Sequence, residues 1–446
     1  MNIKKMLTIG AMMPMLVIAE EQQQVTVSEE SAESANADVQ VELSAADTMQ
    51  QLFDEFAASK GDNFAYGLAD KKTGAVYFCA AETLSVGPAS NMFIQKRQLA
   101  FEKAFNRILF DFVKYRTGIN VTETLNETLS DDSSNVLETP KNLKDASTGI
   151  AKKLKVATEA AIDKGLRALD VDPSKYASKP LEEKRQTYLD SIMKNGAVRA
   201  VGSTVGVTVV KTMETHSADQ VYVIGVIAKY DPLIEDVARC IAREVRPNVE
   251  LKKGISAASL MKKPAEELVQ NFGLRYYYNE EGVPEIISFG QWSTGYTGKD
   301  VRKQDRKNQI AAHNAELLAL QAMTEFIGGS IALEEEGGAG NMLEEANVFD
   351  EEGGFREDNF DEVVSKYRSK CRVTGKAKMR GRAPIDSPKF ITHPSGQKVA
   401  LFAVRYSFDV LDSVKNPKSK KTATQPKVPV VDEGTSGKAE GTSYDF

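Results

Sequence analysis

The chain has 446 residues and a formal net charge of −6 at pH 7, from 57 Lys and Arg against 63 Asp and Glu. Because charges of both signs are mixed along it, the sequence lacks the basic face of a dedicated nucleic-acid-binding protein, and no nucleic-acid partner is expected. Its three cysteines, Cys79, Cys240 and Cys371, are too few for a disulfide framework. Their spacing leaves open whether any two of them pair.

Residues 1–19 have the pattern of a signal peptide. Lys4 and Lys5 precede an apolar run at 6–18, which is shorter than the ~20 residues of a membrane span. We expect cleavage after Ala19 and therefore a periplasmic or secreted protein, the alternative being an uncleaved N-terminal anchor. No later segment of the sequence is apolar enough to span a bilayer, so no transmembrane span is expected after cleavage.

Two segments of the sequence hold few large apolar residues, one at 20–47 and one at 415–446. Such compositions cannot bury enough surface to offset the entropy of the chain. We therefore predict a disordered linker at 20–47 and a disordered tail at 415–446, with the ordered part of the chain between them.

The ordered part contains an element that occurs twice. Residues 63–74, NFAYGLADKKTG, are similar to residues 271–282, NFGLRYYYNEEG. Each is followed by a run of β-branched and aromatic residues, so each predicts a β-hairpin that turns at DKKTG or NEEG. A short helical run precedes each hairpin, MQQLFDEFAAS before the first and PAEELVQ before the second.

A long amphipathic helix is predicted after each hairpin. When the two runs are aligned from Gln98 and Gln309, apolar residues coincide at positions three and four apart, which form one stripe of an α-helix. Each run reaches a glycine, Gly118 or Gly329, at which we expect the helix to end. The coinciding pairs are Ala104 with Ala315, Leu109 with Leu320, Phe112 with Met323 and Tyr115 with Phe326.

A second hairpin of two long strands is predicted at 196–232 and again at 375–410, in each case after another helical run. The first half also holds a predicted helical insert at about 119–175, and the second holds an acidic, glycine-rich loop at about 332–358. The residues matched between the late hairpins are Val221 with Val399, Val226 with Val404 and Tyr230 with Phe408.

The repeated order of elements predicts an α+β fold made by tandem duplication of a small unit. Each unit is expected to form a mostly antiparallel sheet with its long helix packed on one face. The first unit would span 48–245 and the second 246–414. The alternative is a chance similarity between generic hairpins and helices.

The sequence contains no recognisable catalytic, cofactor-binding or metal-binding motif. It has no HExxH, CxxC or GxSxG, and in FGQWSTGYTGKD an aspartate, Asp300, stands where a P-loop needs Ser or Thr. His216 and His393 lie in predicted turns and His313 on a predicted helix surface, so all three are expected to face solvent. We therefore predict no catalytic, cofactor or metal site, although whether the protein is an enzyme stays open.

Two features leave a ligand open. The acidic residues at 350–361 could collect around calcium, although their spacing does not fit an EF-hand loop. Trp292 and Tyr296, in SFGQWSTGYTG, could contact a sugar or a partner, or could cap the core of the second unit.

Residues 63–238 combine a YGLAD…GAVYFCAAE hairpin, a helix with Ala100 and Ala104, and a strand at 221–228 closed by Asp231-Pro232. In this order they resemble the middle-domain family of flagellar assembly protein T and related small bacterial surface lipoproteins. The chain departs from that group by its duplication, its inserted helix and its lack of a lipid-anchor cysteine. The resemblance implies an envelope scaffold or ring-type assembly factor without catalysis.

We therefore expect an exported structural, assembly or protein-interaction protein of the bacterial cell envelope. A protein partner in the envelope is implied, and a homo-oligomer is a further option. The alternative is an exported carbohydrate-binding protein or a hydrolase that uses carboxylates held between the two units. That alternative requires a deep cleft between the units, lined by two such carboxylates and Trp292.

Overall fold

The computed structural model describes residues 43–129, 137, 143–296, 298–334, 357–376 and 380–416. The predicted signal peptide lies outside the described residues, as do most of the predicted linker, most of the predicted tail and most of the acidic loop at 332–358. Within the ranges that are described, no helix is both long enough and apolar enough to cross a bilayer.

The first half of the fold builds a three-stranded antiparallel sheet with the order β1-β3-β2. Its central strand, β3, is buried along its whole length. The elements of this half are α1 (Ala45–Ser59), β1 (Val76–Thr83), α2 (Phe93–Thr128), α3 (Leu143–Val156), α4 (Glu159–Ala168), η2 (Pro173–Tyr176), α5 (Leu181–Gly202), η3 (Ser203–Gly206), β2 (Val207–His216), β3 (Tyr222–Tyr230) and α6 (Pro232–Arg243).

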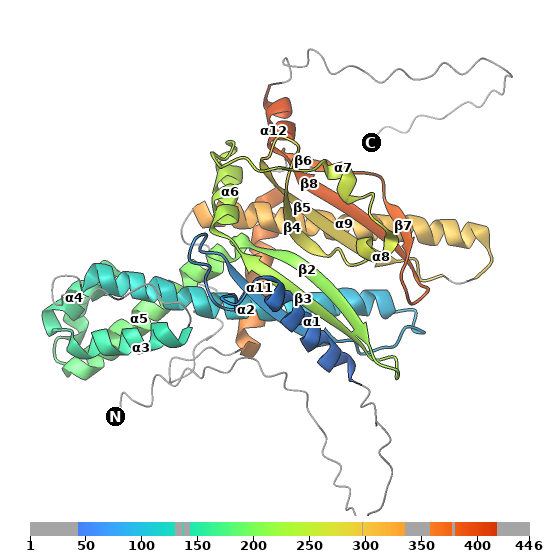
Figure 1. Ribbon diagram of the computed structural model, residues 1–446. Helices are drawn as coiled ribbons and strands as arrows, with labels where there is room; N and C mark the ends of the chain where they lie inside the picture. The colour runs from blue at the N-terminus through green and yellow to red at the C-terminus, as the bar shows by residue number, and fades with distance from the viewer. Residues whose placement is uncertain are drawn as a thin grey trace, which may run out of the picture.

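The second half builds a five-stranded antiparallel sheet in which β4, β5, β8 and β6 follow one another and β7 also pairs with β8. The α+β class predicted from the sequence is thereby confirmed (Figure 1). The elements of this half are α7 (Ala257–Leu260), α8 (Ala265–Leu268), β4 (Gly273–Tyr278), β5 (Pro284–Ser293), α9 (Val301–Glu334), α11 (Glu357–Gly375), β6 (Arg382–Pro384), β7 (Lys389–Thr392), β8 (Lys398–Tyr406) and α12 (Phe408–Lys415).

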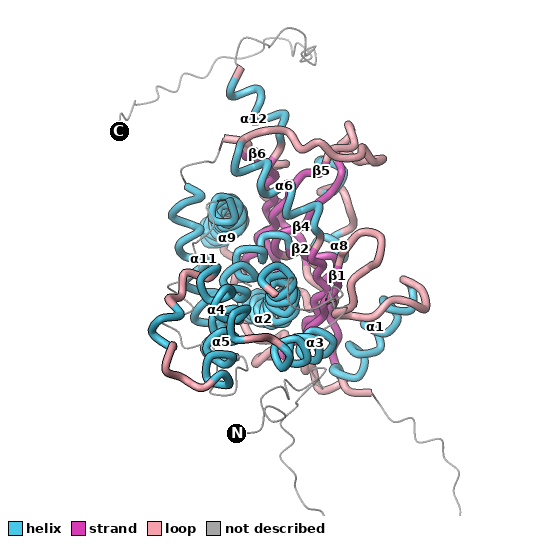
Figure 2. The backbone as a smooth tube through the Cα atoms, turned by 90° about the vertical axis from the view of Figure 1, so that its left-hand side faces the viewer, coloured by secondary structure: helices cyan, strands magenta, loops and turns pink. Residues whose placement is uncertain are grey.

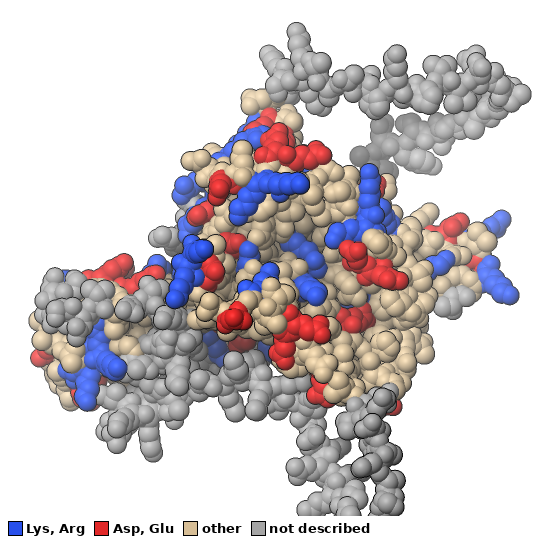
Figure 3. Space-filling view, viewed as in Figure 1, with Lys and Arg blue, Asp and Glu red and all other residues tan. Residues whose placement is uncertain are grey.

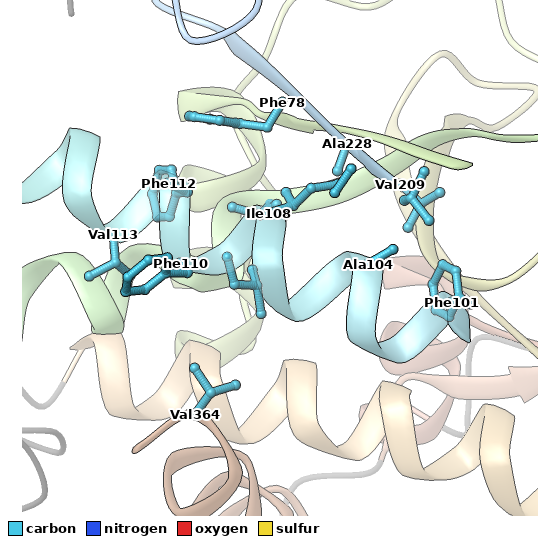
Figure 4. Packing of buried hydrophobic residues seen from close by; sticks show 14 of the residues in the cluster. Phe78, Phe101, Ala104, Ile108, Phe110, Phe112, Val113, Val209, Ala228 and Val364 are labelled. Carbon is cyan, nitrogen blue, oxygen red and sulfur yellow. The ribbon is translucent and has the colours of Figure 1, made fainter. Parts of the chain in front are cut away.

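The long helices cover one side of the two sheets. Figure 2 shows the strands as one band, with α2, α9 and α11 on one side and α1 and α8 on the other. Figure 4 shows α2 between the first sheet and α11, with Phe112 turned toward Phe78 of β1 and Val364 of α11 on the far side. These residues belong to one buried cluster, so the apolar stripe of α2 closes the core of the first half.

The two halves repeat the same topology. In each, a strand leads into a long helix, a second helix follows, and a late strand returns to pair beside the first strand: β1 with β3, and β5 with β8. β2 in one half, and β6 and β7 in the other, pair with the far side of the returning strand, whereas β4 pairs with β5 and has no counterpart in the first sheet. A helix then closes each half, α6 or α12.

One corner of the fold is built twice at atomic detail. The amide of Asp231 donates to Gly206 O at 3.1 Å, and the amide of Ser407 donates to Gly381 O at 2.9 Å. In both copies a Cβ on the glycine would come within 2.9 Å of the ring of a tyrosine that ends the returning strand. Glycine is therefore required at both corners by the same close approach.

This corner corrects the predicted register of the late hairpins. The last strand residue is Tyr230 in β3 and Tyr406 in β8, so the match of Tyr230 with Phe408 is wrong by two residues. The burial of a second matched pair also contradicts the predicted register, because Val221 is 43% exposed and Val399 is 0% exposed. The sequence could not detect the error, because a shift by two keeps every side chain on the same face of a strand.

The alignment of the long helices fares better. Its matched positions are buried in both copies, apart from Leu320, which is partly buried. The helices do not end at Gly118 and Gly329, however, because α2 runs to Thr128 and α9 to Glu334. In α9 the adjacent Gly328 allows close packing, since a Cβ there would lie 1.8 Å from the carbonyl oxygen of Cys371. The predicted insert at 119–175 accordingly begins inside α2.

Three other boundaries differ from the prediction. Residues 63–74 form no strand beyond the single bridge of Ala69 with Val76, because Gly67 turns the chain with φ +73°. Residues 196–206 are helical rather than extended, because Gly196 lets α5 approach Thr117 of α2. The predicted linker ends before 47, since a capping box at Ser44 starts α1 at Ala45.

The outer part of α2 forms a helical arm together with α3, α4 and α5, which projects from the body of the molecule in Figure 1. The arm has a buried cluster of its own, which includes Leu125, Ile162 and Tyr188. The arm therefore has an internal core of its own, and the C-terminal end of α5, with Ala197 and Val201, joins the core of the first sheet.

Candidate functional site

The two sheets meet at their edge strands, β2 of the first half and β4 of the second. Within the described ranges β2 pairs only with β3 and β4 only with β5, so no backbone pairing joins the sheets. Side chains cross the gap instead: Arg275 Nη2 donates to Thr212 Oγ1 at 3.1 Å. A Cβ on Gly273 would come within 3.5 Å of Val209. Side chains of the two halves therefore meet along this junction.

Three polar side chains form a buried group at the junction, which we call the polar bridge: Arg97 of α2, Glu214 of β2 and His393, which follows β7. Arg97 Nε lies 3.1 and 3.0 Å from the two carboxylate oxygens of Glu214, and Nη2 lies 2.8 Å from Oε2. His393 Nε2 lies 3.0 Å from the same Oε2. The polar bridge therefore joins two elements of the first half to one segment of the second.

Arg97 also bonds the second half directly. Its Nη2 donates to Val269 O at 3.2 Å and its Nη1 to Gln291 Oε1 at 3.4 Å. The guanidinium lies 5.0 Å from the centre of the Phe272 ring. A charged group that is 0% exposed is tolerated only when it is paired and hydrogen-bonded in this way.

Burial and pairing set the protonation states within the polar bridge. Burial alone would raise the pKa of Glu214, but the Arg97 charge and the bond with His393 lower it to about 2. Burial lowers the pKa of His393, against the opposing effect of its bond to Glu214. Because the amide of Ser395 donates to Nδ1 at 3.0 Å, the neutral imidazole carries its proton on Nε2. At pH 7 the bridge holds one cation, one anion and one neutral ring.

The position of His393 corrects the prediction that it faces solvent. It is 2% exposed, its ring packs against Phe93 at 5.4 Å between centroids, and it borders neither of the cavities described below. His216 and His313 are exposed, as predicted. The polar bridge thus acts as a fastening between the halves and has no face open to a substrate.

An open cleft lies beside the polar bridge, between the α1 region of the first half and the α7–α8 region of the second. It consists of two cavities of about 350 and 620 Å³, which share Tyr77, Lys229, Tyr276 and Tyr278 in their walls. We call the two cavities together the junction cleft. Figure 3 shows Lys and Arg side chains, interspersed with Asp and Glu, around the middle of this face.

Lysines and tyrosines lie against each other in the cleft wall. Lys229 Nζ lies 4.9 Å from the centre of the Tyr276 ring, and Lys252 Nζ lies 5.2 Å from that of Tyr278. Lys229 Nζ also donates to Tyr276 OH and to Asp231 Oδ2, both at 2.6 Å. Burial would lower the pKa of Lys229, but these two bonds raise it. Lys229 is therefore a fixed, charged part of the wall.

Arg275 stands in the smaller cavity without a counter-charge. Its Nη2 donates to Thr212 Oγ1 and, at 2.9 Å, to Gln270 O. No carboxylate within the described residues forms an ion pair with it, and its Nε is buried without an acceptor. Burial lowers the pKa of Arg275 to about 10, which leaves it charged at neutral pH.

The carboxylates of the cleft are engaged in local structure. Asp70 Oδ1 accepts bonds from the amides of Lys72 and Thr73 and from the Thr73 hydroxyl, at 2.7 to 3.0 Å. These bonds lower the pKa of Asp70. Asp231 caps α6 through the amide of Leu233 at 3.0 Å and pairs with Lys229. Both carboxylates are held by these bonds, and the lowered pKa of Asp70 is opposite to that of a general acid.

The other candidate residues lie away from the cleft. Trp292 packs against the buried cluster of the second half, and Tyr296 OH accepts a bond from the amide of Asp300 at 3.0 Å. Of the acidic residues at 350–361, those at 350–356 lie outside the described residues and the others lie in α11. The three cysteines are free thiols, and burial raises the pKa of Cys79 to about 12 and that of Cys371 to about 11.

Sequence reasoning missed Arg97, Glu214 and Arg275, and it predicted solvent exposure for His393, the fourth junction residue. Two of them carried a usable signal, since both are charged residues inside predicted strands, Glu214 after Met213 and Arg275 between Leu274 and Tyr276. A charge inside a strand that is buried on both faces needs a partner, so such positions mark candidate sites.

Comparison with known proteins gives little further guidance. Residues 147–243, which span most of the arm together with β2, β3 and α6, match the family model "Domain of unknown function (DUF6844)". No curated protein matches the chain. A crystal structure of a hypothetical protein from Francisella tularensis is similar at 18% identity and a TM-score of 0.49, over 84% of this chain and 94% of that one. This likeness is too slight to assign a fold or a function, and neither match concerns flagellar assembly or surface lipoproteins.

Proposed function

We propose that the chain is an exported, non-catalytic recognition protein of the bacterial cell envelope, which serves there as a structural or assembly component. The junction cleft is the recognition site. Export follows from the signal-peptide pattern of residues 1–19, with a periplasmic or secreted location after cleavage. The resemblance of residues 63–238 to envelope assembly proteins agrees with this role.

The observation that carries the proposal is the difference between the polar groups buried in the polar bridge and those that line the junction cleft. The histidine and carboxylate that proton transfer would require, His393 and Glu214, are buried and bonded to each other. The open surface instead offers tyrosine rings and cations. Rings and cations of this kind bind a partner or ligand, and the described residues that line the cleft include no activated nucleophile or general base.

A carbohydrate-binding function is the second candidate, and one observation favours it. The cleft between the halves, which that hypothesis requires, is present and lined by tyrosines. Its carboxylates, Asp70 and Asp231, are both engaged, and Trp292 lies in another cluster. The cleft therefore supports carbohydrate binding, whereas these two carboxylates do not support a hydrolase.

Site-specific photo-cross-linking in the native host tests the proposal. A benzoylphenylalanine residue is placed at position 278 in the cleft wall, and a control is placed at His313, which is exposed on α9. We expect a product of defined mass in the envelope fraction from position 278 and none from 313. A product of twice the chain mass identifies a second copy as the partner. Recovery of the protein in the cytosolic fraction, or the absence of any cleft product, contradicts the proposal.

A further inference from the structure

The smaller cavity of the junction cleft holds a positive charge that the described residues do not neutralise. The neighbouring cations are compensated: Arg97 pairs with Glu214 and Lys229 with Asp231. Arg275 has neutral partners only, a hydroxyl and a carbonyl, both bound by the same Nη2. Half-buried arginines are normally paired with carboxylates, so the missing anion requires an explanation.

Arg275 is held in one orientation although its charge is unpaired. The bonds from Nη2 to Thr212 of β2 and to Gln270 O fix the plane of the guanidinium. Among the described residues Nη1 forms no hydrogen bond, whereas Nε is buried without an acceptor. Because Nε is closed off and Nη2 already donates twice, Nη1 is the donor that an oxygen of a carboxylate or phosphate group in the cavity can reach.

The aromatic wall restricts the rest of the ligand. The rings of Tyr276 and Tyr278 lie 6.0 Å apart between centroids and are inclined by 81°. Two rings at right angles form a corner rather than a slot, so they cannot hold a planar base between them. A puckered sugar ring fits a corner, where its C–H faces contact the rings and its hydroxyls reach Asn271 or Lys229. A cavity of about 350 Å³ has the size of small-molecule sites.

We propose that the junction cleft binds an acidic sugar, whose carboxylate or phosphate is received by Arg275 while Tyr276 and Tyr278 contact the sugar ring. This inference deepens the carbohydrate-binding form of the recognition function proposed above and rests on it. Neutral sugars lack the group that Arg275 requires, and nucleotides lack a slot for the base. Because the Arg275 guanidinium is partly buried, its bond to an anion is expected to be stronger than one at a fully exposed arginine.

Calorimetric titration of the full chain tests the inference with four probes: a uronic-acid disaccharide, a hexose 6-phosphate, a neutral disaccharide and adenosine monophosphate. We expect the neutral sugar and the nucleotide to bind at least about 10-fold more weakly than the better acidic sugar. The first two probes decide whether the anion is a carboxylate or a phosphate.

Variants assign the binding to the named residues. Arg275→Gln is expected to weaken the acidic sugar by at least roughly 10-fold. Arg302→Gln, an exposed arginine on α9 that does not line the cleft, is the matched control and is expected to leave binding unchanged. If Arg275→Gln does not fold, Tyr278→Ala at the cleft wall serves in its place, and is expected to weaken the disaccharide while binding of inorganic phosphate stays the same.

Three results overturn the inference: no acidic sugar binds, Arg275→Gln binds as tightly as the natural chain, or the nucleotide binds best. A neutral sugar that binds as tightly as an acidic one also overturns it, but leaves the proposed recognition function standing. Failure of the cross-linking experiment at position 278, together with binding of no probe, removes both.

Discussion

The polar bridge and the junction cleft both place an arginine away from bulk water at the same junction, but they treat its charge differently. Arg97 has a carboxylate, a carbonyl and an amide oxygen around it, whereas Arg275 has only Thr212 and Gln270 O. The contacts of Arg97 hold the two halves together, whereas the charge of Arg275 is not neutralised by any carboxylate among the described residues. The comparison teaches that burial of a charge alone does not identify a site, whereas burial without a counter-charge does.

The largest expected effect concerns the polar bridge. Glu214→Gln leaves Arg97 buried without a counter-charge, so we expect a loss of about 3–5 kcal/mol in the free energy of unfolding, measured by urea denaturation. The matched control is Glu82→Gln, because Glu82 pairs with the exposed Lys103 at 3.1 Å, and it should lose less than about 1 kcal/mol. Equal losses in the two variants would show that the bridge does not fasten the halves.

The pH dependence of stability tests the protonation states of the bridge. The folded pKa of His393 lies below its model value of 6.5, so the unfolded chain binds the proton more readily and stability falls as the pH drops below that value. Glu214 has a folded pKa of about 2 against a model value of 4.5, so its contribution is present above 4.5 and is lost as the pH falls toward 2, by about 3 kcal/mol in total.

His393→Gln separates these two windows. We expect it to lower the free energy of unfolding at pH 8 by about 1–3 kcal/mol, because a buried bond to Glu214 is lost. Its stability should then be flat between pH 6.5 and 5, where the natural chain becomes less stable. Urea denaturation at a series of pH values measures both. A variant that keeps the slope of the natural chain would mean that another group titrates there.

In the cleft, removal of a charge is expected to cost little stability, in contrast to Glu214→Gln in the polar bridge. Arg275→Met removes a half-buried charge that lacks a counter-charge, so the free energy of unfolding should change by less than about 1 kcal/mol or increase. Urea denaturation measures this directly against Glu214→Gln. A loss as large as that of Glu214→Gln would mean that Arg275 belongs to the fastening and that the comparison between the two regions is wrong.

The smallest effect is expected at the rim of the cleft. Lys252 is exposed and lies over the Tyr278 ring, so Lys252→Gln should change stability by less than about 0.5 kcal/mol. It should also slow association of an acidic sugar at low salt by less than roughly 10-fold, because a rim charge steers rather than anchors a ligand. Stopped-flow binding at two salt concentrations measures the rate, and an effect that persists at high salt would place Lys252 among the anchoring residues.

The sequence predicted the parts of this protein that depend on local pattern. The stripe that pairs Phe112 with Met323 indicated the long helices correctly, because a helix repeats its contacts every three to four residues. The junction could not be predicted in the same way. Arg97 and Glu214 are 117 positions apart, and Glu214 and His393 are 179 apart. No local spacing encodes such contacts, so a histidine in a turn was assigned to the surface.

The most direct test of the account observes both arginines in one sample. Selective ¹⁵N labelling of arginine side chains resolves the Nε–H signals, and Arg275→Gln and Arg97→Lys assign them. On titration with the acidic sugar that binds best, the account predicts that the Arg275 signal shifts saturably while the Arg97 signal stays in place. A shift of Arg97, or an unmoved Arg275 in the saturated protein, would contradict the division of the junction into a closed bridge and an open cleft.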